Sequence, residues 1–150
     1  MTGSTGGRPP SPAVALALEL RAFNGQLKRK LRDQADVGDL TPSQTAVLLH
    51  LESESSATTS ALARAAGMRP QSMGAVVAAL EAAGHVAGAP DPQDGRQTLL
   101  SLTDACRRWL TEGRAARQDW LSRTIEARLS PDEQTQLIAA LPLLQRLVAE

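Results

Sequence analysis

The chain has 150 residues, which is enough for one domain with a real core and short for two independent ones. Lysine plus arginine equals aspartate plus glutamate at 16 each, so net charge neither points to a polyanionic partner nor excludes one. The single cysteine, Cys106, excludes an internal disulfide, and no apolar run approaches the roughly 20 residues of a membrane span. Because the N-terminal stretch also lacks a signal-peptide pattern, we expect a soluble, cytoplasmic protein.

Two segments form the first quarter of the chain. Residues 1–12 are mostly Gly, Ser, Thr and Pro, which predicts a disordered tail. From Ala13, apolar residues recur at steps of four, three, four and four, which predicts an amphipathic helix that ends near Val37-Gly38. The apolar stripe is Leu16, Leu20, Phe23, Leu27 and Leu31. The rest of the helix carries a basic run, which usually faces water, with phosphate contact as the alternative; it consists of Lys28, Arg29, Lys30 and Arg32.

Capping signals mark the next three helices. Thr41-Pro-Ser-Gln44 has the pattern of a capping box with Pro at the first helical position. Thr59 is expected to cap a short helix, and Gly67 then allows the left-handed turn that reverses the chain. Pro70 begins the following helix. Its inward stripe is Met73, Val76, Val77 and Leu80, and its outward positions are Gln71, Ser72, Ala75 and Ala78.

A hairpin and two further helices complete the chain. Residues 85–87 and 97–102 read as paired strands around the loop Asp91-Pro-Gln-Asp-Gly-Arg96. Thr103-Asp104 caps a long helix, and Ser130-Pro-Asp-Glu133 repeats the capping-box pattern. The last helix has an apolar stripe, and Pro142 within it predicts a kink or a break. That stripe is Leu137, Leu141, Leu144 and Val148.

This order of elements predicts a mainly α fold with a small β-hairpin wing, the arrangement of a winged helix-turn-helix. A helix enters the major groove of DNA when its outward side is slim and carries polar groups near its N-terminal end. Gln71 suits adenine, and Ser72 suits a base edge or a phosphate. The small side chain of Ala75 permits close approach, and Arg69 lies at the mouth of the helix, where guanine or a phosphate is within reach.

The loop of the hairpin adds a second contact. Arg96 suits a narrow minor groove, and Asp94 is placed to hold its guanidinium by a bidentate contact. A surface turn with a local salt bridge is the alternative. Residues 59–103 hold three arginines and three acidic residues, so one copy would bind DNA weakly and two copies would be needed.

Six short motifs in this order resemble the MarR family of bacterial transcriptional regulators. The resemblance covers the chain from about Leu16 to its end, and the order and spacing of the motifs together are specific. They are Leu40-Thr-Pro-Ser-Gln44, Leu62-Ala63, Arg69-Pro-Gln-Ser-Met73, Leu80-Glu-Ala-Ala-Gly84, Asp91-Pro-Gln-Asp-Gly-Arg96 and Leu102-Thr103.

The resemblance implies a single domain over residues 13–150, in which a winged helix-turn-helix lobe (41–103) is flanked by dimerisation helices (13–38 and 104–150). It implies a homodimer that occupies a palindromic, inverted-repeat operator in double-stranded DNA and represses transcription. Release by a small aromatic or lipophilic effector is also implied. The expected DNA-binding residues are Thr59, Arg69, Pro70, Gln71, Ser72, Ala75, Asp94 and Arg96. The expected dimerisation residues are Leu16, Leu20, Phe23, Leu137, Leu141 and Leu144.

Other functions have less support from the residues and motifs of the sequence. Cys106 falls in the first turn of a helix, where the dipole lowers a thiol's pKa, so a redox-responsive regulator is one alternative. His50 and His85 lack the convergent partners that a metal needs, so no metal or cofactor is expected. Trp109 and Trp120 share a helix face and are expected to pack rather than stack on a ligand. Since neither a nucleophile with its base nor a carboxylate pair is evident, we expect no enzyme; a winged helix used only for protein contact is the remaining alternative.

Overall fold

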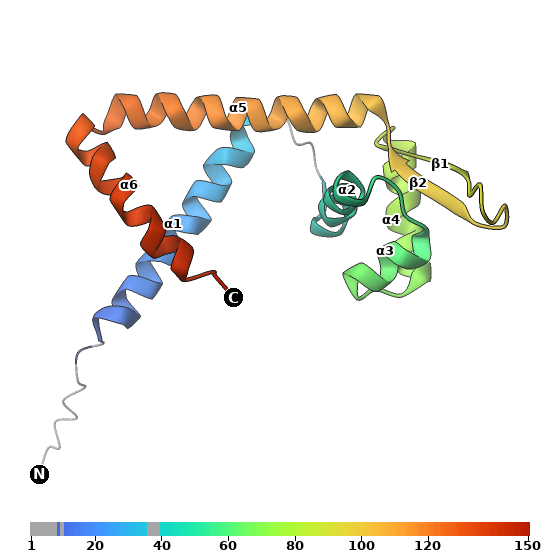
Figure 1. Cartoon of the computed structure of the whole chain (residues 1–150), viewed down its shortest axis with the longest axis horizontal. Coiled ribbons are helices and arrows are strands. Elements are labelled where there is room, and N and C mark those ends of the chain that lie inside the picture. Colours follow the sequence, from blue (N-terminus) through green and yellow to red (C-terminus); the bar gives the residue numbers. More distant parts are fainter. Residues whose placement is uncertain (1–8, 10, 36–39) are drawn as a thin grey trace, which may run out of the picture. The chain divides into compact units, whose positions relative to one another are not determined.

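The computed structural model describes Pro9, residues 11–35 and residues 40–150. Within this part the chain is mainly helical with one antiparallel hairpin, as the sequence predicts (Figure 1). The elements are α1 (Pro12–Gln34), α2 (Pro42–Glu54), α3 (Thr59–Ala66), α4 (Pro70–Ala82), β1 (Val86–Pro90), β2 (Thr98–Leu102), α5 (Asp104–Arg128) and α6 (Pro131–Arg146). Most of the predicted tail and the predicted end of the first helix at Val37-Gly38 lie outside the described residues, and Pro12 is already helical.

The chain divides into two compact units. The first, called here the helical unit, comprises residues 1–35 and 117–150, and the second, called the lobe, comprises residues 36–116. The division falls within α5, so the first half of this helix belongs to the lobe and its second half to the helical unit.

The lobe has a hydrophobic core of its own. Every helix of the lobe and both strands contribute buried side chains to it, and Met73 and Leu80 of α4 are both 0% exposed. The buried cluster is Val47, Leu48, Leu51, Ala57, Leu62, Ala63, Met73, Val77, Leu80, Val86, Leu100, Leu102 and Cys106. Burial of this apolar surface is the main free energy that holds α2, α3, α4 and the hairpin together.

The helix starts follow the capping logic of the sequence, with one correction. At α2 the Thr41 hydroxyl accepts from the Gln44 N–H at 3.2 Å, and Gln44 Oε1 accepts from the Thr41 N–H at 2.9 Å. For α3 the prediction that Thr59 is the cap is wrong by one residue. Thr58 is the N-cap, since its hydroxyl accepts from the Ala61 N–H at 3.1 Å, and Thr59 is the first helical residue.

The hairpin is longer than predicted and is extended by a third short segment. Its register pairs Val86 with Leu102 and Pro90 with Thr98, so the first strand runs three residues beyond the prediction. Gly88 is needed there, because a Cβ at this position would lie 2.7 Å from the Thr98 methyl group across the sheet. Ala57 forms an isolated bridge with Leu100, which ties the segment before α3 to the free edge of β2.

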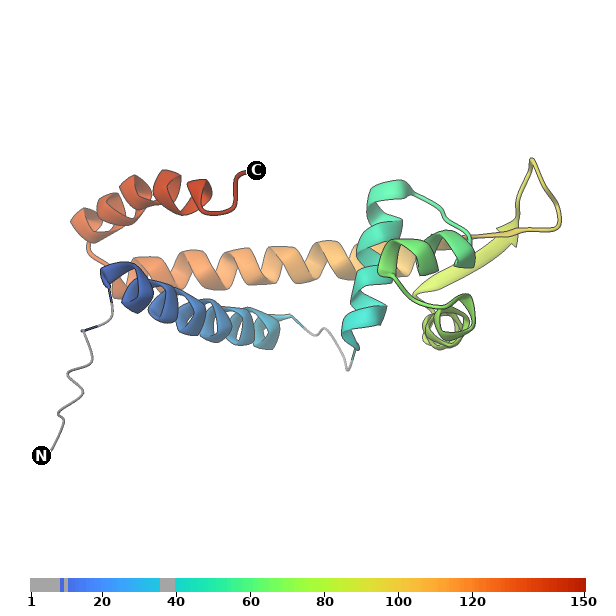
Figure 2. The ribbon, with the colours of Figure 1, turned by 90° about the horizontal axis from the view of Figure 1, so that it is seen from below.

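The helical unit differs because many of its large apolar side chains are exposed. Leu16 and Phe23 of α1 are each 59% exposed, and Leu141 of α6 is 50% exposed. Figure 2 shows the ribbons of α1 and α6 apart from each other. Among the described residues of this unit only Ala35 is buried.

Helix α6 begins as predicted and passes the proline without stopping. Ser130 and Glu133 form the expected capping box, with the Ser130 N–H donating to the Glu133 carboxylate at 2.8 Å. Of the predicted kink or break at Pro142, the break is wrong, since α6 continues to Arg146. Pro142 leaves α6 with one backbone donor fewer, which costs about 3 kcal/mol in a helix interior.

Candidate nucleic-acid interface

The turn between α3 and α4 sets the direction of the candidate recognition helix. Gly67 adopts the left-handed conformation (φ 63°, ψ 30°), which a residue with a Cβ avoids. The Met68 N–H then donates to the Ala63 carbonyl at 2.9 Å, closing the end of α3 as a Schellman motif does. Met68 also packs against the core, so the turn is fixed from inside, and Pro70 can begin α4 two residues later.

Helix α4 has two unlike faces. Met73, Val77 and Leu80 are buried in the lobe, as predicted, while Val76 is half-buried at the margin. The predicted outward positions of this helix are all exposed: Gln71, Ser72, Ala75 and Ala78. Two are short polar or amide side chains near the N-terminal end, and two are methyl groups, so the outward surface is slim enough for a groove.

The N-terminus of α4 is open. The described residues supply no side-chain cap to this helix, since its N-cap residue, Arg69, makes no such bond. The other α-helices in the described ranges start with a hydroxyl that accepts a first-turn N–H, from Ser11, Thr41, Thr58, Thr103 and Ser130. The free N–H groups of Gln71 and Ser72 therefore point from the positive end of a helix, where a phosphate oxygen is a favourable acceptor.

The loop of the hairpin is shaped by its two aspartates rather than by an ion pair. Asp91 Oδ1 accepts from the Gln93 N–H at 2.9 Å, and Asp94 Oδ1 accepts from the Arg96 N–H at 3.1 Å. In the described part of the chain no ion pair joins Asp94 to the Arg96 guanidinium, so the predicted bidentate contact is wrong. Asp94 instead holds the Arg96 backbone, and the exposed guanidinium stays available to a partner.

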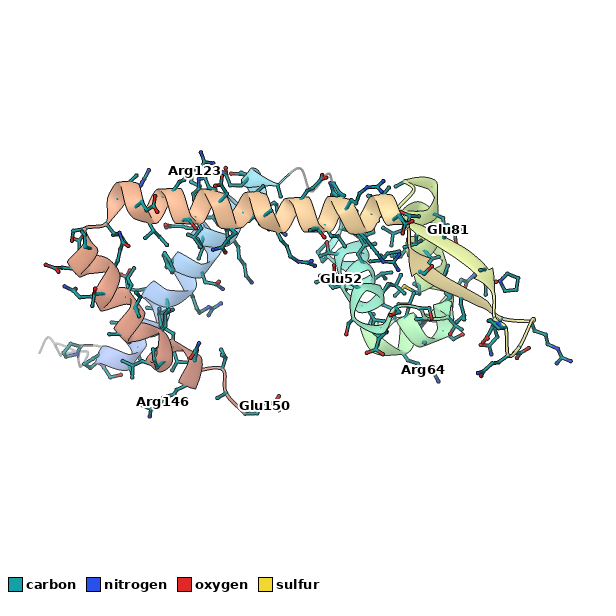
Figure 3. All side chains as sticks on the ribbon, turned by 45° about the horizontal axis from the view of Figure 1, so that its top comes forward. Glu52, Arg64, Glu81, Arg123, Arg146 and Glu150 are labelled. Carbon is teal, nitrogen blue, oxygen red and sulfur yellow. The ribbon has the colours of Figure 1, made fainter. Side chains whose placement is uncertain are left out.

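Three arginines of the lobe are exposed around these elements. They are Arg64 at the end of α3, Arg69 at the mouth of α4, and Arg96 in the loop. Of the residues that the structure describes, none pairs with these three within 4.0 Å. Arg64 points outward from the lobe (Figure 3) and was not among the predicted site residues, although its place in the last turn of α3 was a usable signal.

Cys106 does not have the environment predicted for it. It is 1% exposed in the core of the lobe, and its N–H donates to the Thr103 hydroxyl at 3.1 Å. Burial raises the pKa of the Cys106 thiol, and the nearby Glu52 carboxylate raises it further against the opposing effect of Arg107. The expected lowering by the helix dipole is therefore wrong, and the thiol is poorly suited to rapid oxidation.

Trp109 packs as predicted, and it joins α5 to the base of the hairpin. Its ring stacks on the His85 imidazole with centroids 5.0 Å apart, and it lies against the hydrophobic core. An ion pair between Arg114 and Glu52 adds a second link between α5 and the lobe, in this case to α2. The start of α5 is thus firmly attached to the winged elements.

In the described ranges, none of the helices combines the length and the apolar character that a membrane span requires. In the same part of the chain, no three His, Cys, Asp or Glu side chains gather where a metal ion could be held.

Comparison with known proteins gives one consistent result. Residues 38–97 match the model of the MarR family. An uncharacterized HTH-type transcriptional regulator of Mycobacterium bovis is 36% identical over 135 residues, which is 90% of this chain and 94% of the relative. The crystal structure of a putative transcriptional regulator from Pseudomonas aeruginosa is 34% identical with a TM-score of 0.76, over 92% of this chain and 97% of that one.

A third match shows the fold alone. A mutant of Staphylococcus aureus MepR, solved bound to an oligodeoxyribonucleotide, is 20% identical with a TM-score of 0.71 over 89% of this chain and 98% of its own. The mainly helical order of elements with one antiparallel hairpin agrees with the family match and with the Pseudomonas aeruginosa structure. The chain therefore belongs to the MarR family of DNA-binding, winged-helix transcriptional regulators.

Proposed function

We propose that the protein acts in the cytoplasm as a homodimeric repressor on an inverted-repeat operator whose half-sites lie about one helical turn apart. The observation that carries the proposal is the division of α4, whose apolar side is buried while its slim, polar side is exposed next to an open N-terminus. In the proposal Gln71 reads adenine, and Ser72 and Arg69 contact base edges or phosphates. Ala75 lets the backbone of α4 come close to the bases.

The remaining predicted contacts surround this helix. Arg96 enters the minor groove, with its backbone held by Asp94. Thr59 at the start of α3 and Pro70 at the start of α4 bring the two helix ends to the sugar-phosphate backbone.

The outward apolar stripes of the helical unit support the dimer. Monomeric proteins rarely leave so many large apolar side chains uncovered, and a second copy of the same unit would bury them. Six of the exposed side chains lie within α6 and its C-cap: Leu137, Ile138, Leu141, Leu143, Leu144 and Leu147. Since α5 belongs to both units, the separation of two α4 helices in such a dimer would depend on this helix. That dependence gives a small aromatic or lipophilic effector a physical route to release the operator.

Selection of bound fragments from random DNA tests the proposal. Enrichment of an inverted repeat with half-sites about one turn apart is the expected result, because two equal α4 helices would read it. Recovery of a single, non-repeated site would contradict the twofold arrangement. Recovery of no enriched sequence would favour the winged helix as a protein-contact module, whose apolar contacts would respond little to added salt.

A further inference from the structure

One face of α1 carries four cations that no apolar contact explains. Arg21, Lys28 and Arg32 follow one another at steps of seven and four residues, which places them on the same side of the helix. Arg29 reaches toward this side, since its Nη1 lies 3.7 Å from the Cβ position of Gly25, one turn after Arg21. All four side chains are exposed. We call Arg21, Lys28, Arg29 and Arg32 the basic face.

The other charged residues of α1 lie elsewhere around the helix. Lys30 comes three residues after Leu27 and seven after Phe23, so it belongs to the apolar side and not to the basic face. Glu19 lies on the far side of the helix from Arg21 and Lys28, and Asp33 lies one turn after Arg29. Within the described part of the chain, no carboxylate pairs with the basic face within 4.0 Å. Among the described residues, the basic face is therefore a positive surface without an ion-pair partner.

The net charge of the lobe indicates which partner the basic face suits. Residues 36–116 contain six Lys or Arg residues against nine Asp or Glu residues, so the unit that holds α4 and the wing is acidic on balance. Two of those six cations, Arg107 and Arg114, are already paired with Asp104 and Glu52. Duplex DNA binding draws much of its free energy from neutralising phosphates, and the lobe has few free cations to supply it.

We propose that the basic face of α1 binds phosphates of duplex DNA and supplies much of the salt-dependent affinity. The inference rests on the DNA binding of this family, and it adds a contact surface outside the winged elements. Lys28 and Arg32 lie one turn apart, about 6 Å along the helix axis, so the pair can engage neighbouring phosphates. Binding of this kind is independent of sequence and leaves base reading to α4.

The salt dependence of DNA affinity tests this directly. The triple variant Lys28→Gln, Arg29→Gln, Arg32→Gln is titrated with a mixed-sequence duplex at several salt concentrations. The slope of log affinity against log salt should fall by about 0.9 for each phosphate that the variant no longer neutralises, or about 3 per protomer. The matched control, Lys30→Gln, Arg128→Gln, Arg146→Gln, removes the same charge from exposed cations outside the basic face and should change the slope far less.

Three results would overturn the inference. The first is an equal slope change in the two triple variants, which would mean that only net charge matters. The second is a changed molecular mass of the free protein in light scattering, which would make the basic face a subunit contact. The third is an unchanged slope. The single variants Arg32→Gln and Lys30→Gln repeat the comparison if the triple variant has a lowered melting temperature. A wild-type protein with no affinity for any duplex would instead remove the DNA-binding function itself.

Discussion

The lobe and the helical unit are built from similar amounts of apolar sequence and use it in opposite ways. In the lobe, three helices, the hairpin and the start of α5 enclose a core whose largest side chains are fully buried. In the helical unit, the stripes on α1 and α6 have the same periodicity, yet Leu16, Phe23 and the leucines of the α6 stripe are exposed, and Leu20, Leu27 and Leu31 are only half-buried. Burial of a large aliphatic side chain stabilises a fold by about 1.5–3 kcal/mol. The lobe gains that free energy within one chain, and the helical unit needs a second surface to gain it.

The largest expected effect tests the exposed apolar stripe of the helical unit. Leu141→Asp places a carboxylate in the middle of the apolar stripe of α6, where an apposed subunit would have to desolvate it. We expect loss of self-association in light scattering together with loss of operator binding. Thr135→Asp, on another side of the first turns of α6, is the control and should leave both intact. A monomeric Leu141→Asp protein that binds its operator tightly would count against the dimer.

Leu80→Ala perturbs the other half, the core of the lobe. The side chain is 0% exposed, so its truncation should lower the free energy of unfolding by about 2–5 kcal/mol in urea titrations. This loss should not depend on protein concentration, because the contacts of Leu80 lie within one chain. A cost below about 1 kcal/mol would show that the lobe is not the closed core described here.

The next effect separates base reading from phosphate contact within the lobe. Gln71→Ala should cost about 1–3 kcal/mol of operator affinity and relax the preference at one position of each half-site. Arg96→Ala should weaken binding to every sequence by a similar factor, because a loop arginine in the minor groove senses potential more than base identity. Parallel measurements on a set of single-base operator variants distinguish the two. Uniform losses for both proteins would remove the base-reading role of Gln71.

A smaller effect tests the corrected start of α3. Thr58→Ala removes the hydroxyl that accepts from the Ala61 N–H and should cost about 1 kcal/mol of unfolding free energy. Thr59→Ala changes the first helical residue and should alter the free energy of unfolding by only about a few tenths of a kcal/mol. The reverse order of the two variants in thermal unfolding would restore Thr59 as the cap.

The smallest effect at neutral pH concerns Cys106. Because burial raises the pKa of this thiol above its unfolded value, its contribution to stability is fully present below the unfolded pKa and is lost as pH rises. Above about pH 8.5 the free energy of unfolding should therefore fall with increasing pH. Cys106→Ser should lose this dependence in urea titrations between neutral and alkaline pH. An identical pH profile in both proteins would contradict the burial of the thiol.

The sequence predicts best where one local rule acts alone. Thr41 with Gln44 and Ser130 with Glu133 each specify a helix start through hydrogen bonds between near neighbours, and Pro70 specifies one through its fixed φ; all three starts are confirmed. At Thr58 and Thr59 two hydroxyls compete for one role, and only the direction of the incoming chain, fixed by the Ala57 bridge to β2, decides between them.

The wing shows what local rules leave open. An aspartate two residues before an arginine can meet either its guanidinium or its backbone N–H, and the tight loop favours the N–H of Arg96. The net negative charge of the lobe, by contrast, cannot be read from the whole chain, whose net charge is zero. It depends on how the structure divides the residues between two units.

The mass of the protein bound to a selected operator tests the account most directly. Two chains on each inverted repeat are the expected result, with the stripes of α1 and α6 buried between them and one α4 helix at each half-site. A stable complex of one chain with the full operator would contradict the claim that the exposed helical unit exists to pair two DNA-reading lobes.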